Sequence, residues 1–386
     1  MTTKSFSLSE VLAVAKRHPF YNPEIKYPLD ETALQAVRDW AVKNQTEVNL
    51  RSQPLLHKND IYKTVERLTH DASPENVYRE SSYMSITGGG SGGVPMMFAV
   101  DVHENRQQRA QMGKLLQNCG VIKRKDWINK IIYTSEPLTG AQRAFLRATL
   151  GDVKICSVMG SSEAGPWALS SPDLVGEENL NSSSMDFVFD TRDMIIEILS
   201  PAGLDDGKPP SDIDHLPLGE TGIIVQTSLR RLRNPLVRYI TGDLGSLHPL
   251  PEMASAVVPE SERQYLRVLR MQGRDRRFSF KWYGAYFEFE KMRALLQAEE
   301  CGVLQWQVIL GQLESSGLPT LQVRLLRAPS RADVLSEEQL VKRVRTFFLV
   351  LPENEHVFSI VFVKNLDGFE RSSTAGKVIN FVDRLH

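Results

Sequence analysis

The chain has 386 residues, of which 41% are hydrophobic and 24% are charged, and its formal net charge at pH 7 is -1. At roughly 100–200 residues per domain, this length predicts two or three globular domains. A net charge so close to zero creates no field that attracts nucleic acid or an anionic membrane. No apolar run approaches the ~20 residues that cross a bilayer, so we expect no membrane span.

Cysteine usage and the N-terminal segment both favour a cytoplasmic location. The three cysteines, Cys119, Cys156 and Cys301, are far apart and odd in number, which argues against a disulfide framework or a zinc cluster. Glu10 and Lys16 interrupt the apolar run near the N-terminus. This segment is therefore predicted to be a short amphipathic helix and not a signal peptide.

The first 275 residues predict an α/β domain with several layers. Segments 30–44 and 60–71 each open with Asp and have apolar residues at helical spacing. A glycine-rich segment follows at 83–98. Further along the chain we expect helices at 106–121 and 138–151, and buried strands at 126–136 and 152–165. This alternation of strand and helix is typical of α/β layers.

The second half of the chain has a different character. From about residue 182 to residue 250 it is rich in strands and turns, which predicts a β-rich subdomain. Beyond residue 276 we expect strands at 305–313 and 320–328, a helix at 336–350 and a strand at 356–366. The sequence therefore predicts a large domain of residues 1–275 and a small α+β domain of residues 276–386.

The glycine-rich segment YMSITGGGSGGVPMMF, residues 83–98, matches G-x-G-x-x-G at Gly88, Gly90 and Gly93. A dinucleotide site needs a helix that opens inside this motif, but Val94 and Pro95 follow at once and oppose a helix. A nucleotide-binding loop of the Walker type needs a lysine, and none lies between Tyr83 and Val100. The apolar flanks predict instead a turn between two buried strands, whose N–H groups and hydroxyls can face phosphate oxygens.

The segment TGGGSGGVP resembles the phosphate loop of adenylate-forming enzymes, a superfamily of acyl-CoA synthetases, luciferases and peptide-synthetase adenylation domains. The resemblance implies that the loop binds the phosphates of ATP. The loop residues that it assigns to the nucleotide are Thr87, Gly88, Gly89, Gly90, Ser91 and Gly92.

Two further segments resemble motifs of this superfamily, in the same order along the chain. TSEPLT at 134–139 resembles the segment beside the adenine and acyl pockets, which implies contacts from Ser135, Glu136 and Pro137. MGSSEAG at 159–165 resembles the Tyr-Gly-x-Thr-Glu motif. It implies that Ser161 binds the nucleotide, Ser162 contacts the α-phosphate and Glu163 holds Mg²⁺, which prefers carboxylate oxygens.

Three more residues come from the C-terminal motifs of the superfamily. RYITGDLG resembles the motif whose aspartate, here Asp243, accepts hydrogen bonds from the ribose hydroxyls. GRDRRFSF resembles the hinge motif, which implies that Arg274 contacts ribose or phosphate. STAGKV resembles the motif of the catalytic lysine, here Lys377, whose charge would stabilise the transition state of adenylation.

The resemblance runs from about residue 83 to residue 379 and is closest to the phenylacetate–CoA ligase branch. It implies that ATP and Mg²⁺ activate an aryl or other small organic acid of specialised metabolism as an acyl-adenylate. The acyl group would then pass to CoA or to a carrier-protein phosphopantetheine, while residues 276–386 move between the two steps. A homodimer is possible. The alternatives are adenylation that feeds a partner reductase, and a nucleotide-binding homologue without catalysis.

The chain departs from the superfamily in two places. The stretch between Gly93 and Glu163 is shorter than in relatives, which implies a shortened core and a reshaped acyl pocket. The phosphate loop also lacks the lysine that usually precedes its proline, since Gly93 and Val94 occupy that place.

Overall fold

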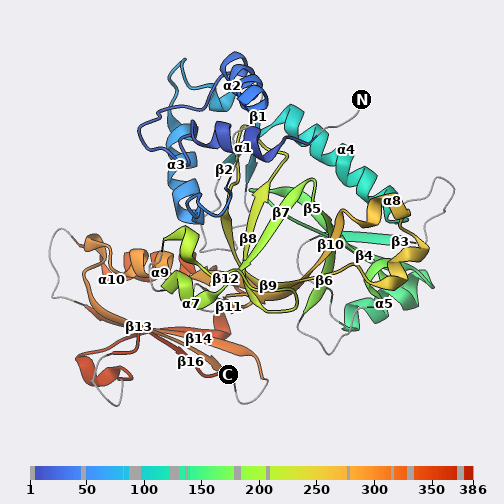
Figure 1. Ribbon diagram of the computed structural model, residues 1–386. Coiled ribbons are helices and arrows are strands. Elements are labelled where there is room, and N and C mark those ends of the chain that lie inside the picture. The colour runs from blue at the N-terminus through green and yellow to red at the C-terminus, as the bar shows by residue number, and fades with distance from the viewer. Residues whose placement is uncertain are drawn as a thin grey trace. The chain divides into compact units, whose positions relative to one another are not determined.

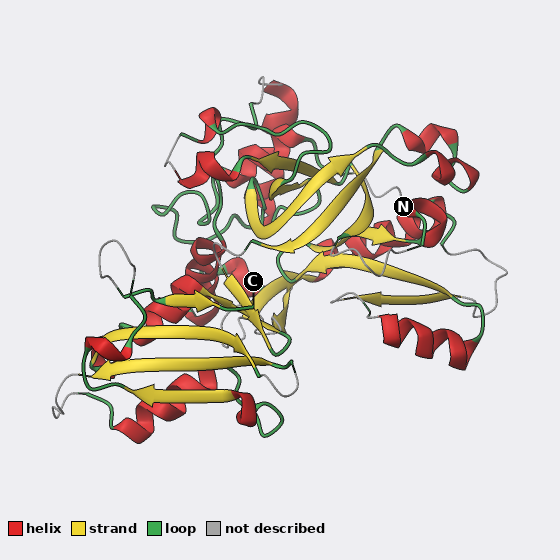
Figure 2. Ribbon diagram, turned by 90° about the horizontal axis from the view of Figure 1, so that it is seen from below, coloured by secondary structure: helices red, strands yellow, loops and turns green. Residues whose placement is uncertain are grey.

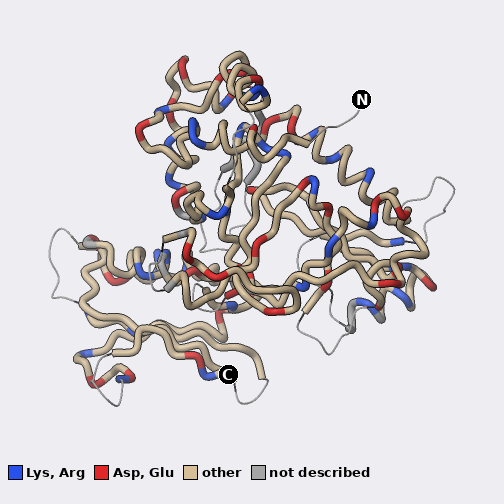
Figure 3. Tube along the Cα trace, viewed as in Figure 1, with Lys and Arg blue, Asp and Glu red and all other residues tan. Residues whose placement is uncertain are grey.

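The computed structural model describes residues 5–44, 49–80, 82–86, 97–121, 130–134, 138, 140–177, 184–205, 209–275, 279–313, 317–327, 334–371 and 378–385. The chain forms two compact units, Met1–Ile86 with Met97–Asp275, and Arg276–His386. Figure 3 shows positively and negatively charged residues interspersed along the described part of the chain. None of the helices in that part combines the length and apolar character needed to span a bilayer.

The first unit is built on one twisted eight-stranded sheet, in which β10 lies between β6 and β9 (Figure 1). The strands, in their order across the sheet, are β3 (Lys130–Thr134), β4 (Lys154–Ser161), β5 (Gly165–Ser170), β6 (Met185–Asp190), β10 (Leu266–Arg274), β9 (Tyr239–His248), β8 (Gly222–Ser228) and β7 (Met194–Leu199). Only the β3–β4 pair is parallel among these neighbours. The strands of the β-rich stretch, β6 to β9, thus share a sheet with β3, β4, β5 and β10.

The longer helices described in this unit are α1 (Leu8–Ala15), α2 (Glu31–Asn44), α3 (Lys58–His70), α4 (Val102–Asn118) and α5 (Gly140–Leu150). Apolar spacing predicted α2 to α5, and the structure confirms each within a few residues. α1 begins with a capping box between Ser7 and Glu10, but its residues from Val11 to Ala15 are all buried. The short helix predicted there is confirmed, and most of its residues are buried.

Short elements complete the first unit. They are α6 (Pro172–Val175), α7 (Pro201–Asp205), α8 (Glu260–Arg263), and the 3-10 turns η1 (Val77–Arg79), η2 (Pro210–Asp212) and η3 (Glu252–Ala256). β1 (Ser82–Ile86) and β2 (Met97–Asp101) pair as a separate antiparallel hairpin. This confirms that the glycine-rich segment joins two strands. The segment itself, 87–96, lies outside the described residues.

α4 is the helix that packs beside β5 on the sheet (Figure 1). Its first turn is capped by Asp101, whose side chain accepts a hydrogen bond from the Glu104 N–H. Its buried residues Met112 and Leu115 join a core with Leu169 of β5. α4 therefore brings its polar side chains to the end of β4 and the start of β5.

The second unit is a four-stranded sheet with helices packed on its apolar face (Figure 2). In order the strands are β15 (Phe358–Phe362), β14 (Pro319–Arg327), β13 (Val303–Gln312) and β16 (Phe381–Asp383). The other elements are the hairpin β11 (Ser279–Trp282) and β12 (Ala285–Glu288), helices α9 (Phe289–Leu296) and α10 (Glu337–Phe347), and the 3-10 turns η4 (Glu299–Cys301), η5 (Glu355–Val357) and η6 (Leu366–Gly368). The predicted strands and helix of this region are confirmed.

Candidate active site

The turn between β4 and β5 carries Glu163, the residue predicted to hold Mg²⁺. The Ser161 Oγ accepts a hydrogen bond from the Ala164 N–H at 3.0 Å, which closes the turn. Gly165 has a φ of 69°, where a side chain would be strained, and a Cβ on Gly160 would lie 2.7 Å from the Gly165 carbonyl oxygen. The two glycines permit a turn tight enough to bury Glu163, which is 4% exposed.

Two residues of α3 contact the Glu163 carboxylate. The Tyr62 hydroxyl donates a hydrogen bond of 2.8 Å to Oε1, and the Lys58 Nζ lies 3.8 Å from the same oxygen. Lys58 and Tyr62 are four residues apart, so they share one face of the helix. The sequence predicts this helix but gives no signal that its face meets Glu163, because the contact joins segments about a hundred residues apart.

The Glu163 carboxyl group is held in its charged form. Burial raises its pKa, but the charge of Lys58 and hydrogen bonds, including the one from Tyr62, outweigh burial and bring the pKa below its ordinary value. The site therefore contains a buried carboxylate that is ionised at neutral pH.

Polar side chains also fix the backbone of this turn. Arg231 donates one hydrogen bond to the Glu163 carbonyl oxygen and another, at 3.2 Å, to the Gln108 Oε1. The Gln108 Nε2 donates to the Ala164 carbonyl oxygen at 3.3 Å. α4 and the segment after β8 thus hold the turn from outside, so the position of Glu163 depends on three elements.

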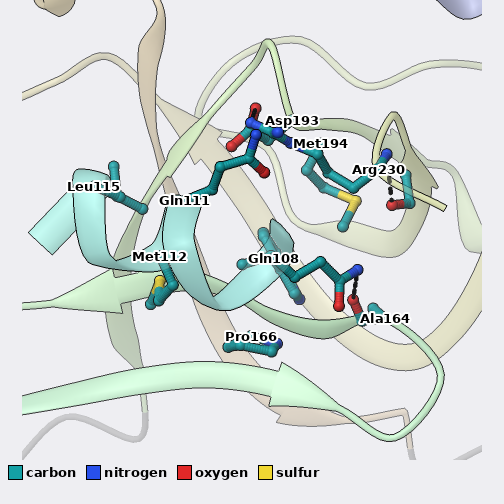
Figure 4. A pocket seen from close by; sticks show the side chains of 11 residues that line it. Gln108, Gln111, Met112, Leu115, Ala164, Pro166, Asp193, Met194 and Arg230 are labelled. Carbon is teal, nitrogen blue, oxygen red and sulfur yellow. Dashed lines mark hydrogen bonds and ion pairs between the residues drawn. The ribbon is translucent and has the colours of Figure 1, made fainter. Parts of the chain in front are cut away.

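A small cavity lies beside the turn, and Figure 4 shows Gln108, Gln111 and Ala164 on its wall. Its volume is about 20 Å³. Such a space holds about one water molecule. The cavity is therefore too small to be the binding pocket of an organic acid.

Asp243 lies on β9, in a partly exposed position. Its N–H donates a hydrogen bond to the Thr241 Oγ1 at 3.0 Å, and Gly242 before it has a φ of 79°. Across the sheet Asp243 is paired with Arg274 of β10, and the Asp275 N–H donates to the Gly242 carbonyl oxygen at 2.9 Å. The structure therefore brings together the backbones of Asp243, the predicted ribose ligand, and Arg274, which was predicted to contact ribose or phosphate. Nothing is described of the Arg274 side chain.

The start of α3 is fixed to the strand that carries Asp243. The Leu56 N–H donates to the Arg238 carbonyl oxygen, and the Ile240 N–H donates to the Leu56 carbonyl oxygen, each at 3.0 Å. The fully buried Arg238 guanidinium pairs with Glu197 at 3.2 Å and donates to the carbonyl oxygen of Arg51. These contacts tie the position of Lys58 to β9. Sequence patterns did not reveal that Arg238 holds the segment before α3 in this way.

The other predicted site residues divide into two groups. Ser162 is partly exposed in the turn beside Glu163. Outside the described residues lie Thr87, Gly88, Gly89, Gly90, Ser91, Gly92, Ser135, Glu136, Pro137 and Lys377. The first unit therefore places Ser161, Ser162, Glu163, Asp243 and the Arg274 backbone.

The Glu163 carboxylate suits Mg²⁺ as a ligand. Among the described residues no group of three His, Cys, Asp or Glu side chains converges on one point. Mg²⁺ at nucleotide sites uses one or two carboxylates together with substrate phosphates, so a dedicated cluster is not required. The ionised Glu163 provides one hard oxygen ligand, which the ion would share with Lys58.

Comparisons with protein-family models and with curated proteins found no match. Among solved structures, the chain matches 2-hydroxyisobutyryl-CoA ligase, solved with 2-HIB-AMP and CoA in its thioesterification state, with a TM-score of 0.53 and 14% identity. The match covers 99% of this chain and 91% of that one. The amide bond synthetase McbA from Marinactinospora thermotolerans follows, with a TM-score of 0.39, 17% identity and coverage of 65% and 45%.

These findings define the fold of the protein. The chain has the mixed α/β fold of 2-hydroxyisobutyryl-CoA ligase over nearly its whole length. The mixed α/β fold implied by the resemblance of six short motifs is confirmed.

Proposed function

We propose that the protein is an AMP-forming ligase that activates a small carboxylic acid with ATP. The observation that carries the proposal is that the turn with Glu163 and the strand pair with Asp243 and Arg274 belong to one sheet of the shared fold. The matching ligase was solved in complex with 2-HIB-AMP and CoA.

In the proposed first step, a carboxylate oxygen of the acid attacks the α-phosphorus of ATP, and the bond to pyrophosphate breaks. Asp243 accepts hydrogen bonds from the ribose hydroxyls, and Ser162 donates to an α-phosphate oxygen. Lys377 places its charge beside the developing negative charge. Mg²⁺, held by Glu163 and phosphate oxygens, would neutralise part of the phosphate charge.

In the proposed second step, the thiol of CoA or of a carrier-protein phosphopantetheine loses its proton to solvent and attacks the acyl carbonyl carbon. The thioester forms and AMP leaves. The glycine-rich segment, Thr87–Gly92, and the segment Ser135–Pro137 would line the phosphate, adenine and acyl sites. An aryl or other small organic acid is the proposed substrate.

Pyrophosphate release from Mg²⁺-ATP, measured across a panel of aryl and short-chain acids with and without CoA, tests the proposal. Lys377→Ala should lower the rate by about 10²–10³-fold, as for loss of one preformed electrostatic donor, while the exposed Lys342→Ala should not. Asp243→Ala should lower the affinities for AMP and ATP alike by about 10–100-fold. Asp152→Ala, at an exposed position, should change neither affinity.

The outcomes separate the alternatives. Acid consumption that does not need CoA would indicate that the adenylate passes to another acceptor, such as a reductase. Binding of AMP without pyrophosphate release from any acid would indicate a nucleotide-binding protein. Absence of both would contradict the proposed function.

A further inference from the structure

Lys58, Tyr62 and Glu163 form a cluster that the proposed reaction does not use as a unit. The Lys58 ammonium lies 3.8 Å from the Glu163 Oε1, and it also lies over the Tyr62 ring, 5.3 Å from the ring centre. The Lys58 side chain is 18% exposed, whereas that of Glu163 is 5% exposed. The cation is thus the accessible member of the cluster, and the carboxylate lies beneath it.

α3 packs against two strands of the first unit. They are β2 and β9, the latter of which carries Asp243. The Leu56 backbone pairs with Arg238 and Ile240 at the start of β9, two residues before Lys58. Lys58 is therefore fixed at the end of α3 that faces Glu163.

The arginines around this turn are directed to structural partners. Arg231 donates to the Glu163 carbonyl oxygen, and Arg230 pairs with Asp193. Arg233 lies 3.3 Å from the Asp101 carboxylate. Lys58 differs from them because its ionic partner is the carboxylate proposed to face the nucleotide.

A second cation beside Mg²⁺ suits the charges at this place. A nucleoside triphosphate carries more negative charge than one divalent ion offsets, and the Lys58 ammonium lies 3.8 Å from the Glu163 carboxylate. The glycine-rich segment has no lysine between Tyr83 and Val100, so it offers phosphate only dipoles and hydroxyls. An ammonium group has three donors and can serve a carboxylate and a phosphate oxygen together.

We propose that Lys58 binds the terminal phosphate oxygens of the nucleotide, with Glu163 and Tyr62 orienting its ammonium group. This inference rests on the proposed ATP-dependent function. It assigns to α3 the cation that the glycine-rich segment lacks. Lys58 is a binding residue here, and its effect should appear in the affinity for ATP and not in the affinity for AMP.

The test compares ATP and AMP affinities, measured by isothermal titration on the full chain with Mg²⁺. Lys58→Met should lower the affinity for ATP by about 10–100-fold, the usual effect of losing one contact to a charged group. It should leave the affinity for AMP within about threefold of wild type. Lys58→Arg should restore most of the ATP affinity. Lys63→Met, an exposed lysine on the same helix, should change neither affinity.

A purely structural Lys58 would give another pattern, because loss of its pairing with Glu163 would weaken both ligands equally and lower the melting temperature. That result would overturn the inference. If Lys58→Met does not fold, Lys58→Gln, which keeps a donor for Glu163 but no charge, takes its place in the same comparison. If the wild-type protein binds ATP and releases pyrophosphate, but the variants keep the wild-type ratio of ATP affinity to AMP affinity, the role of Lys58 alone is overturned. Wild-type protein that binds neither nucleotide would overturn the proposed function as well.

Discussion

His18 shows how a single buried side chain can set the response of the fold to pH. Its Nδ1 accepts the Phe20 N–H at 3.2 Å, and its Nε2 lies 3.0 Å from the Arg233 carbonyl oxygen, to which it can donate. This pairing suits the neutral ring, because a proton on Nδ1 would remove the acceptor of Phe20. Burial lowers the pKa of His18 to about 3, although the bond to Arg233 opposes the shift.

A depressed pKa implies loss of stability in mild acid. Between pH 6.5 and about 3 the unfolded chain binds a proton at His18 and the native chain does not, so the free energy of unfolding falls as pH falls. At roughly 1.4 kcal/mol per pH unit, this residue should account for about 2 kcal/mol of loss between pH 7 and pH 5. Urea unfolding at both pH values should show that His18→Gln loses about 2 kcal/mol less unfolding free energy than wild type between pH 7 and pH 5. An equal loss in both proteins would show that other groups are responsible.

The candidate site shows what local sequence can and cannot reveal about single residues. Glu163 and Asp243 stand in short motifs whose glycines are needed for local backbone geometry, so their neighbourhoods were predictable. Lys58 and Tyr62 were not, since their meeting with Glu163 depends on how α3 is fixed to β9. Tertiary contacts of this kind leave no periodic signal in the sequence.

At the level of elements, close approach of neighbouring strands explains Gly245 of β9. A Cβ there would lie 2.5 Å from the Arg270 carbonyl oxygen and 2.9 Å from the Ile224 Cδ1. The strand that carries Asp243 is therefore packed so closely between β8 and β10 that a methyl group cannot enter without movement of the backbone. Gly113 in α4 differs, because nothing lies within 4 Å of the position of its Cβ.

These two glycines give a matched pair of variants. Gly245→Ala should destabilise the protein by about 1–3 kcal/mol, through overpacking of the sheet. Gly113→Ala should stabilise it by about 0.5–1 kcal/mol, because alanine restricts the unfolded chain and favours the helix. Chemical denaturation of both variants checks the signs. A stabilising effect of Gly245→Ala would mean that the strands are not packed as closely as described.

Elements were predictable where their periodicity is local. Helices α2 to α5 and α10 follow from apolar spacing, and β8 is a continuous buried strand of the kind that an apolar run predicts. The order of the strands was not predictable. β10 is inserted between β6 and β9 although it follows both in the chain, and the turn signals around it do not encode its partners.

At the scale of the whole molecule, each unit has its own hydrophobic core. In the second unit, the rings of Phe287 and Phe348 have centres 5.2 Å apart, and Trp282 and Phe347 pack in the same cluster. All the buried residues of this cluster lie between Phe280 and Val357. The buried residues of this cluster therefore all come from the second unit.

Separate cores predict separate loss of stability. Phe348→Ala removes a fully buried ring and should destabilise the second unit by about 3–5 kcal/mol. Hydrogen exchange should then rise in peptides that cover β13 and β14, while peptides that cover β8 and β9 keep their protection, because no ring of the first unit's core has been removed. Phe145→Ala, at a side chain that is 69% exposed, is the control and should change neither region. If β8 and β9 lost protection together with β13 and β14 in Phe348→Ala, the two cores would unfold as one cooperative structure, and the second unit would have no stability of its own.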